Sequence, residues 1–363
     1  MRDIDIRHFL QLPRKALKVI STEGWGGFRT RVRIRWRGLR AAQQTGKTRS
    51  YGAAYSAEAS DCIGEIRKTL ATDCQPTQWD RADFIDVVVP IFNAYDEFLV
   101  CLCSLLRYQD VYRITLLNDC STDTRITDLL RTLKGCDQNR LRVETNTQNL
   151  GYLRTVNKGM RMTSGDVILL NTDTVVTSGW ARKMRACAHS DERIATVTPF
   201  TNNGRMCSIP GFLQDNDIPD GFTVDSFGEC VERASSNRYP ELVTAVGFCM
   251  YIRRDAMDEL GYFDEVNFEM GYGEEVEFSF RAARSGYRNV LCDNTFVFHK
   301  GGASFLDMRH DLMERHHNVL SDKYPEYWAA VARFEESNPL EELHDRLKRE
   351  MRMRGPARFK LPG

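Results

Sequence analysis

The sequence predicts an α/β protein with a doubly wound, mostly parallel sheet flanked by helices. Three observations predict this fold. Short apolar, β-branched segments recur between residues 84 and 170, segments with helical periodicity separate them, and polar residues follow the strand ends. In sheets of this kind, ligands bind at the carboxyl ends of the strands.

The first strand is predicted at residues 84–90, where a β-branched run stops at a proline. A helix with one apolar face is predicted at 95–108. The alternation continues with strands at 112–117, 141–145 and 166–170 and helices at 126–133 and 157–163. Strands and helices that alternate at this spacing are typical of parallel strands joined by crossover helices.

The 363 residues divide into three predicted parts. These are a basic N-terminal extension (1–80), a main domain (81–304, with halves at 84–175 and 176–304) and a helical C-terminal extension (305–363). Trp328, Val331 and Phe334 predict a buried helical face in the last part. The segment 202–237 lacks clear periodicity, so it is predicted to be a mobile lid or an irregular insertion.

The net charge is zero, but residues 1–50 hold thirteen Lys/Arg against three Asp/Glu. A basic arm on an acidic body suggests an anionic partner. This arm has two interpretations: it packs its apolar side on the main domain, or it lies on an anionic membrane surface. No nucleic-acid partner is predicted.

The eleven cysteines are scattered and form no Cys-x-x-Cys pair. This pattern predicts free thiols packed in a reducing compartment, with neither a zinc site nor a disulfide framework. No segment approaches the ~18–20 apolar residues that span a bilayer. We therefore expect a cytoplasmic protein, with a peripheral position at the inner face of the cell membrane as a further expectation.

The tripeptide Asn171-Thr172-Asp173 directly follows the predicted strand 166–170. A carboxylate at a strand end can hold a hard divalent cation whose other ligands are diphosphate oxygens. Such a cation stabilises the charge that develops on a departing nucleoside diphosphate. Taken alone, the tripeptide is equally compatible with an ordinary turn or helix cap.

Polar residues also follow the first two strands and precede a helix. Asp119 suits a base imide or a ribose hydroxyl. Gly151 lets backbone N–H groups approach an anion, and Arg154 or Lys158 can pair with phosphate. Each of these features, taken singly, also occurs in ordinary turns.

Several motifs in a fixed order resemble glycosyltransferase family two, the inverting GT-A group, and most nearly its rhamnosyl- and galactosyltransferase-like branch. They are Val-Pro-Ile-Phe-Asn (89–93), Asn-Asp-Cys-Ser-Thr-Asp (118–123), Asn-Leu-Gly-Tyr (149–152) and Leu-Leu-Asn-Thr-Asp-Thr (169–174), followed by segments 245–254, 261–265, 271–278 and 297–299. The resemblance covers residues 84–303, about 60% of the chain. It implies a metal-bound nucleotide-sugar donor and an in-line displacement that inverts the anomeric carbon.

The resemblance assigns the metal ligands and the catalytic base. Asp173 matches the metal aspartate and His299 a further ligand of Mn²⁺ or Mg²⁺, while Asn171 replaces the first acid of the usual Asp-x-Asp. Glu275 matches the base that takes the acceptor proton. Glu274 is expected to assist the acceptor or cap the helix. The alternative is that both are first-turn acids favoured by the helix dipole.

The remaining expected site positions fall into two groups. Donor-nucleotide contacts are expected at Pro90, Phe92, Asn93, Asp119, Gly151, Arg154, Asn157, Asn171 and Thr172. Acceptor contacts are expected at Trp180, Gly247, Phe248 and Glu274. Glu277 and Arg281 lie one turn apart and are expected to form a helix ion pair.

The expected activity is transfer of a sugar from a UDP- or dTDP-linked donor to a glycan hydroxyl, with the glycan on a lipid carrier and destined for a surface polysaccharide. Two alternatives remain. A non-catalytic nucleotide-sugar-binding module would share the donor site. A sugar-1-phosphate nucleotidyltransferase usually carries a Gly-rich segment with a basic residue after its first strand, where this chain has Pro90 to Asn93.

Overall fold

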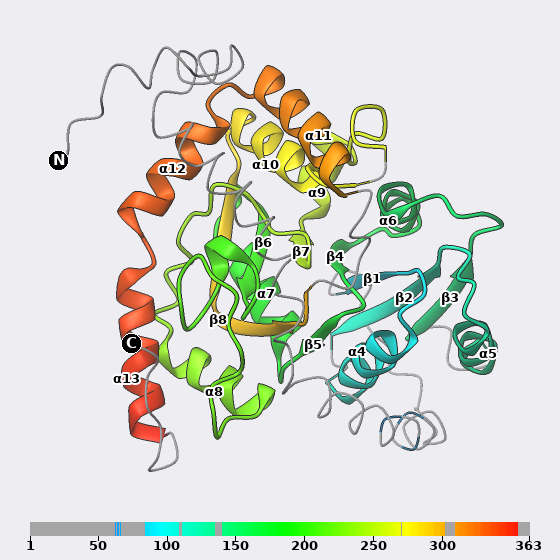
Figure 1. Cartoon of the computed structure of the whole chain (residues 1–363), viewed down its shortest axis with the longest axis horizontal. Helices are drawn as coiled ribbons and strands as arrows, with labels where there is room; N and C mark the ends of the chain where they lie inside the picture. The colour runs from blue at the N-terminus through cyan, green and yellow to red at the C-terminus, as the bar shows by residue number, and fades with distance from the viewer. Residues whose placement is uncertain are drawn as a thin grey trace.

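The computed structural model describes residues 84–108, 111–134, 140–269, 271–301 and 309–354, together with Cys62, Gly64 and Ile66, and only the backbone at 309–314 (Figure 1). The strands are β1 (Ile85–Ile91), β2 (Tyr112–Asn118), β3 (Leu141–Thr145), β4 (Asp166–Leu170), β5 (Thr174–Val176), β6 (Ile194–Phe200), β7 (Cys249–Ile252) and β8 (Arg288–His299). The helices are α4 (Tyr95–Arg107), α5 (Thr124–Leu133), α6 (Tyr152–Arg161), α7 (Trp180–Ala188), α8 (Val224–Ala234), α9 (Arg254–Leu260), α10 (Glu274–Arg284), α11 (Arg309–Lys323), α12 (Tyr327–Ser337) and α13 (Glu341–Arg354), with a 3₁₀ turn, η2, at Arg205–Cys207.

The eight strands form one mixed sheet in the order β3-β2-β1-β4-β7-β6-β8-β5. Four of the seven pairings between these strands are parallel: β3 with β2, β2 with β1, β1 with β4, and β6 with β8. The antiparallel β7 joins the two parallel parts. The predicted α/β fold with a central sheet flanked by helices is confirmed, and one continuous sheet runs through both predicted halves of the main domain.

The sheet brings the predicted polar motifs together. The parallel register of β1, β2 and β4 places their carboxyl ends at the same edge. On the far side, β5 pairs antiparallel with β8, so that Thr174 lies opposite His299. Asp173, one residue before β5, is therefore placed beside a histidine that is 126 positions away in the sequence.

The predicted strands agree closely with the structure, but the helix predicted at 157–163 begins earlier, at Tyr152. Gly151, at φ 81°, precedes its first turn. The apolar face of α6 holds Leu153, Val156 and Met160, all fully buried. Gly159 packs against β1 so closely that a Cβ there would lie 2.5 Å from the Cγ1 of Val88.

The segment 202–237, for which the sequence shows no periodicity, contains η2 and the well-formed helix α8. A capping box begins α8, because the side chains of Thr223 and Ser226 each accept from the other's backbone N–H. The helix is anchored by the fully buried ring of Phe227, which packs edge-on against Phe296 of β8 at 5.0 Å. Much of this segment is therefore packed on the sheet.

The helical C-terminal extension is confirmed by α11, α12 and α13. Trp328, Val331 and Phe334 of α12 are buried, as predicted. Figure 1 shows α11 alongside α10 at the top of the view and α13 near α8 at the lower left. The extension thus supports two separate regions of the main domain.

Of the N-terminal extension, Cys62 and Ile66 are buried in the main hydrophobic core, whereas the basic arm at 1–50, with its packing and membrane interpretations, lies outside the described residues. None of the nine described cysteines is in a disulfide, and eight of them are buried, in agreement with the prediction of packed thiols. Among the described residues, no helix combines the length and apolar composition needed to cross a bilayer.

Candidate active site

Asp173 and His299 face each other at the edge of the sheet. The Oδ2 atom of Asp173 lies 3.4 Å from the Nε2 atom of His299, and both side chains are largely buried. The backbone fixes this approach, because the carbonyl of Asp173 accepts from the N–H of Lys300 at 2.9 Å. Two residues predicted as metal ligands are therefore adjacent.

The ring of His299 is held in one orientation by its surroundings. Its Nδ1 atom lies 2.7 Å from the carbonyl oxygen of Asn203, an acceptor that requires a proton on Nδ1. Nε2 is then the ring nitrogen that faces Asp173, and it could bind a metal once it has lost its proton. Phe248 stacks on the ring with centroids 5.1 Å apart.

Asn202 fixes the main chain of His299 on both sides. Its Oδ1 accepts from the N–H of His299 at 2.8 Å, and its Nδ2 donates to the carbonyl of the same residue at 3.0 Å. The same Nδ2 reaches the carbonyl of Asn216 at 3.1 Å. These bonds tie the loop after β6 to the end of β8.

Electrostatics favour the charged forms of the pair. Burial disfavours the Asp173 carboxylate, but the hydrogen bond and charge of His299 outweigh it and lower the pKa of Asp173. Burial likewise works against a charged His299, and Asp173 nevertheless raises the pKa of His299. The aspartate is therefore ionised at neutral pH, as a ligand of a cation must be.

The pair fits a divalent cation. Two ligands that each lie about 2.1 Å from one octahedral ion stand about 3 Å apart, close to the spacing of the Asp173 oxygen and the His299 nitrogen. Within the described ranges, no cluster of three or more His, Cys, Asp and Glu side chains has the arrangement of a metal site.

The acidic motif lies at the start of α10, after Gly273 in the left-handed region at φ 113°. Glu275 turns back so that its Oε2 accepts from the N–H of Gly273 at 3.3 Å. Glu274 is 5% exposed, and its Oε2 has no hydrogen-bond partner among the residues that the structure describes. Burial raises the pKa of both carboxyls, and the charge of Glu275 raises that of Glu274 further.

Tyr152 connects the acidic motif with the Asp173 region. Burial raises the pKa of its phenol, and the charges of Glu274, Glu275 and Asp173 add to the rise. The charges of all three carboxylates therefore act on one phenol. Its hydroxyl contacts the carbonyl of Gly247 at 3.5 Å.

The segment Gly247-Phe248 lies between the two parts of the site. A Cβ at Gly247 would lie 3.9 Å from the Cγ and Cδ of Glu275. The next residue, Phe248, stacks on His299. The predicted base therefore lies beside Gly247, and the predicted metal ligand stacks on Phe248.

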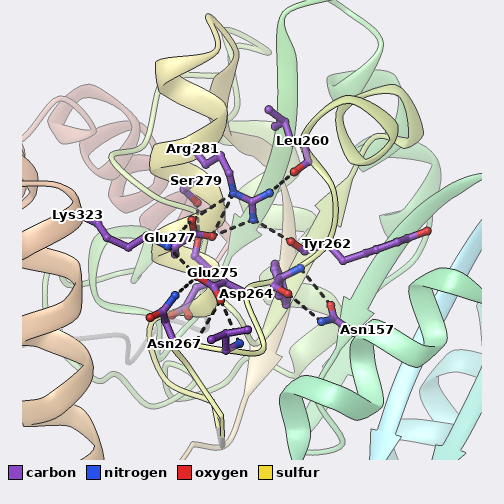
Figure 2. A network of polar contacts seen from close by, with 12 residues as sticks. Asn157, Leu260, Tyr262, Asp264, Asn267, Glu275, Glu277, Ser279, Arg281 and Lys323 are labelled. Atoms are coloured by element: carbon purple, nitrogen blue, oxygen red, sulfur yellow. Dashed lines mark hydrogen bonds and ion pairs between the residues drawn. The ribbon is translucent and has the colours of Figure 1, made fainter.

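A polar network holds α10 in place, and Figure 2 shows it from close by. Arg281 pairs with Glu277 at 2.9 Å and donates to the carbonyl of Tyr262 at 2.9 Å. Lys323 of α11 pairs with Asp264 at 2.7 Å and with Glu277 at 3.4 Å. The predicted ion pair of Glu277 and Arg281 is confirmed, and the C-terminal extension supports the helix that carries the acidic motif.

The loops after β1 and β2 are joined by Asn93. Its Oδ1 accepts from the backbone N–H groups of Thr122 and Asp123, at 3.0 and 3.1 Å. Its own N–H donates to the hydroxyl of Ser121 at 3.0 Å. Asn93 therefore shapes the predicted nucleotide-binding edge through these contacts.

Asp119 fixes the loop before α6. Its Oδ1 accepts from the side chain of Asn146 at 2.9 Å and from the N–H of Leu150 at 2.8 Å, and its Oδ2 accepts from the N–H of Gly151 at 2.8 Å. A carboxylate has about four acceptor positions. The predicted contact with a nucleoside would use the remaining one.

Three predicted contact residues are corrected by the structure. Trp180 is fully buried and packs edge-on against Tyr112 at 5.4 Å, so its ring is part of the core and does not face an acceptor. Phe248 is 2% exposed and supports His299. Asn157 is fully buried, and its amide bonds Phe263 at 2.9 and 3.1 Å, so it joins two loops and does not reach a nucleotide.

The other predicted donor residues keep positions compatible with a ligand. Pro90, Phe92, Asn171 and Thr172 are half-buried near the strand ends, and Arg154 is exposed on α6. Their roles remain predictions.

The sequence analysis missed Asn202, Asn203 and Tyr152. The polar run Thr201-Asn202-Asn203 directly follows β6, and a strand-end polar run was the signal that identified Asp119 and Asp173. Tyr152 directly follows Gly151 in a motif that was recognised.

Comparisons with known proteins agree with the α/β fold. Residues 86–261 match the family model described as glycosyl transferase family 2. No curated protein sequence matches the chain. Among solved structures, GalNAc-T7 with UDP, GalNAc and Mn²⁺ is similar at a TM-score of 0.50 and 16% identity, over 75% of this chain and 55% of that protein.

Two further structures are similar at lower TM-scores. The mannosyltransferase PcManGT from Pyrobaculum calidifontis, in complex with GDP-Man and Mn²⁺, has a TM-score of 0.49 and 15% identity, over 84% of this chain and 86% of that one. TarS from S. aureus has a TM-score of 0.44 and 16% identity, over 66% and 40%. Residues 86–261 thus match glycosyl transferase family 2, and the part of the chain that the structure describes has the GT-A fold.

Proposed function

We propose that the protein is an inverting, metal-dependent glycosyltransferase that moves a sugar from a nucleoside diphosphate to a hydroxyl of a glycan. One observation carries this proposal: the Glu275 side chain lies on the open side of Gly247, and the next residue, Phe248, stacks on His299, which lies beside Asp173. The displacement needs a base that takes the acceptor proton and a metal site that stabilises the leaving diphosphate. The residues proposed for these two roles lie beside the segment Gly247-Phe248.

The donor is proposed to be a UDP- or dTDP-linked hexose or deoxyhexose. The match to glycosyl transferase family 2 supports a sugar donor, and the similar GalNAc-T7 structure contains UDP and Mn²⁺. Asp173 and His299 would hold the cation, and the mixed oxygen and nitrogen donor set suits Mn²⁺ better than Mg²⁺. When bound, the cation would neutralise charge on the leaving diphosphate.

Glu275 is proposed as the general base. The acceptor hydroxyl gives its proton to the Glu275 carboxylate while its oxygen bonds the anomeric carbon. The bond from that carbon to the diphosphate oxygen breaks, and the nucleoside diphosphate leaves with the electron pair. Burial raises the pKa of Glu275, which strengthens it as a base near neutral pH.

Glu274 is proposed to bind the acceptor. Its Oε2 atom is buried and unpaired among the described residues, and a buried carboxyl oxygen without a partner is costly unless a ligand supplies one. Burial raises the pKa of this carboxyl, which favours the protonated form that can donate to a sugar oxygen. Gly271 leaves room beside the Glu274 carboxyl, since a Cβ at position 271 would lie 3.9 Å from both oxygens of Glu274.

The acceptor is proposed to be a lipid-linked glycan of a surface polysaccharide, made in the cytoplasm at the inner face of the cell membrane. The basic arm at residues 1–50 supports a site near an anionic surface. The buried free cysteines support a reducing compartment.

The proposal is tested in two steps. A panel of nucleotide sugars with Mn²⁺ is first screened for thermal stabilisation, which identifies the donor. Transfer and donor hydrolysis are then measured for the wild type, Asp173→Ala and Glu275→Gln. We expect Asp173→Ala to lose metal-dependent donor binding, and Glu275→Gln to keep donor affinity but lose orders of magnitude in rate.

The same assays separate the alternatives. A binding module would be stabilised by a nucleotide sugar without turning it over. A nucleotidyltransferase would make a nucleotide sugar from a nucleoside triphosphate and a sugar 1-phosphate. Either result would contradict the proposed transfer.

A further inference from the structure

Four arginines surround an open pocket between α8 and α13, outside the candidate active site. The pocket has a volume of about 440 Å³ and is lined by Arg233, Ala234, Arg346, Arg349, Glu350, Arg352 and Met353. Figure 1 shows α8 and α13 at the bottom of the view, away from α10. We call this feature the arginine pocket.

The arginine pocket is a fixed part of the molecular surface. Leu343, Leu347 and Met351 form the buried face of α13, and the first two pack near Val231 of α8. Arg346 also donates to the carbonyl of Ser235 at 3.0 Å, just after α8 ends. The arginines are therefore presented by a helix that is docked on the main domain.

The positive charge of the pocket is only partly neutralised. Arg233 lies 3.6 Å from Glu229, and Glu350, the single acid in the lining, pairs with Arg354 at 3.1 Å. Arg349 and Arg352 are exposed and have no ion pair with another described residue. The pocket therefore has spare charge for an anionic ligand.

Met353 adds an apolar group to this basic surface. It is 70% exposed, and only one other large hydrophobic residue is as exposed in the described ranges. Arg346, Arg349 and Met353 follow one another at spacings of three and four, which puts them on one side of α13. Arginines beside an exposed apolar side chain are typical of helices that lie at a lipid surface.

We propose that the arginine pocket docks the protein on a membrane that contains anionic phospholipids. The guanidinium groups bind headgroup phosphates, for which their paired N–H donors are suited, and Met353 enters the interface. A free phosphate would use the same donors but gains nothing from the exposed methionine. The proposal concerns residues that the candidate active site does not use.

The test is sedimentation of the full chain with vesicles of phosphatidylcholine alone or mixed with phosphatidylglycerol. Each arginine near an anionic surface contributes about fivefold in affinity. Arg349→Ala combined with Arg352→Ala is therefore expected to weaken binding to the mixed vesicles about 20-fold. The control, Arg131→Ala with Lys134→Ala, removes two exposed charges at the C-terminal end of α5 and is expected to bind as the wild type does.

Met353→Ser is expected to weaken binding to the mixed vesicles without changing the net charge. Melting temperatures of all variants are measured, and unchanged values show that a loss of binding is not a loss of folding. The proposal is overturned if the pocket variant binds like the wild type, if the control loses as much affinity, or if phosphatidylcholine alone binds equally well. Inorganic diphosphate that displaces the protein at micromolar concentration would identify a small-anion pocket and would also overturn it.

Discussion

The Nε2 atom of His299 lies 3.4 Å from the Oδ2 atom of Asp173, and the Nδ1 atom of the same ring lies 2.7 Å from the carbonyl of Asn203. The contact with Asn203 decides which ring nitrogen of His299 can bind a metal. A proton held on Nδ1 leaves Nε2 free to act as a metal ligand. The loop after β6 thus orients the histidine that ends β8.

Asn202→Ala is expected to weaken Mn²⁺ binding about 10- to 100-fold, the usual effect of removing a group that orients a metal ligand. The variant loses both side-chain bonds to the main chain of His299. Titration of Mn²⁺ by calorimetry measures the effect without needing the acceptor. Asn294→Ala, which removes a half-buried asparagine of β8 bonded to Asn237, is the control. Equal Mn²⁺ affinity in the wild type and Asn202→Ala would contradict the orienting role.

The rate of transfer is expected to fall as the pH drops below the raised pKa of Glu275. Burial raises the pKa of this carboxyl above its ordinary value of 4.5, and a base works only when it is deprotonated. The acid limb of kcat/KM should therefore lie above pH 4.5. Glu275→Gln should abolish that limb together with most of the rate, whereas Glu232→Gln on α8 should change neither. Because Glu274 and Glu275 interact, the limb reports the pair.

Gly247→Ala is expected to fold normally and to impair acceptor binding. The new Cβ would lie 3.9 Å from the Glu275 side chain, an ordinary contact, and Gly247 has no positive φ. The methyl group would nevertheless occupy space beside the base. Initial rates should show a higher KM for the acceptor and an unchanged KM for the donor. A change in the donor KM alone would show that Gly247 lies beside the donor, and it would contradict this prediction.

Acid should loosen the C-terminal helix α13 through His344. Burial, followed by the charge of Lys348, lowers the pKa of this histidine from 6.5 to about 4. The unfolded chain therefore binds the extra proton first, and stability falls as the pH drops from 6.5 toward 4. The loss amounts to about 3 kcal/mol at most.

Chemical unfolding at several pH values measures this loss. His344→Leu removes the titrating group and should flatten the stability curve across that range. The ring packs 5.4 Å from Phe212, so a leucine retains part of the apolar contact. A curve as steep as that of the wild type would assign the acid sensitivity to other groups.

The sequence pattern of apolar residues predicted strands and helices well where that pattern follows directly from burial. The strands β1, β2 and β4 were found from apolar runs, because both faces of these strands are covered. The start of α6 was missed, since its N-cap at Gly151 has no side chain to signal it. The helix α8 was missed because the Gly- and Pro-rich segment before it obscured its capping box at Thr223.

Trp180 shows why side-chain exposure was harder to predict. A tryptophan after Ser-Gly is equally compatible with an exposed sugar platform and with a core anchor. The side on which α7 packs decides between them, and here that side faces Tyr112 of β2. Asn157 is similar, because its bonds to Phe263 cross 106 positions of sequence.

The sequence by itself determined the alternation of strands and helices, the polar strand ends and the order of the motifs, since each depends on neighbouring residues. Only the tertiary structure decided which distant groups meet. Strand pairing placed Asp173 beside His299, and loop packing placed Asn202 and Asn203 behind that ring. Contacts of this kind depend on how the whole chain closes on itself, which no local pattern records.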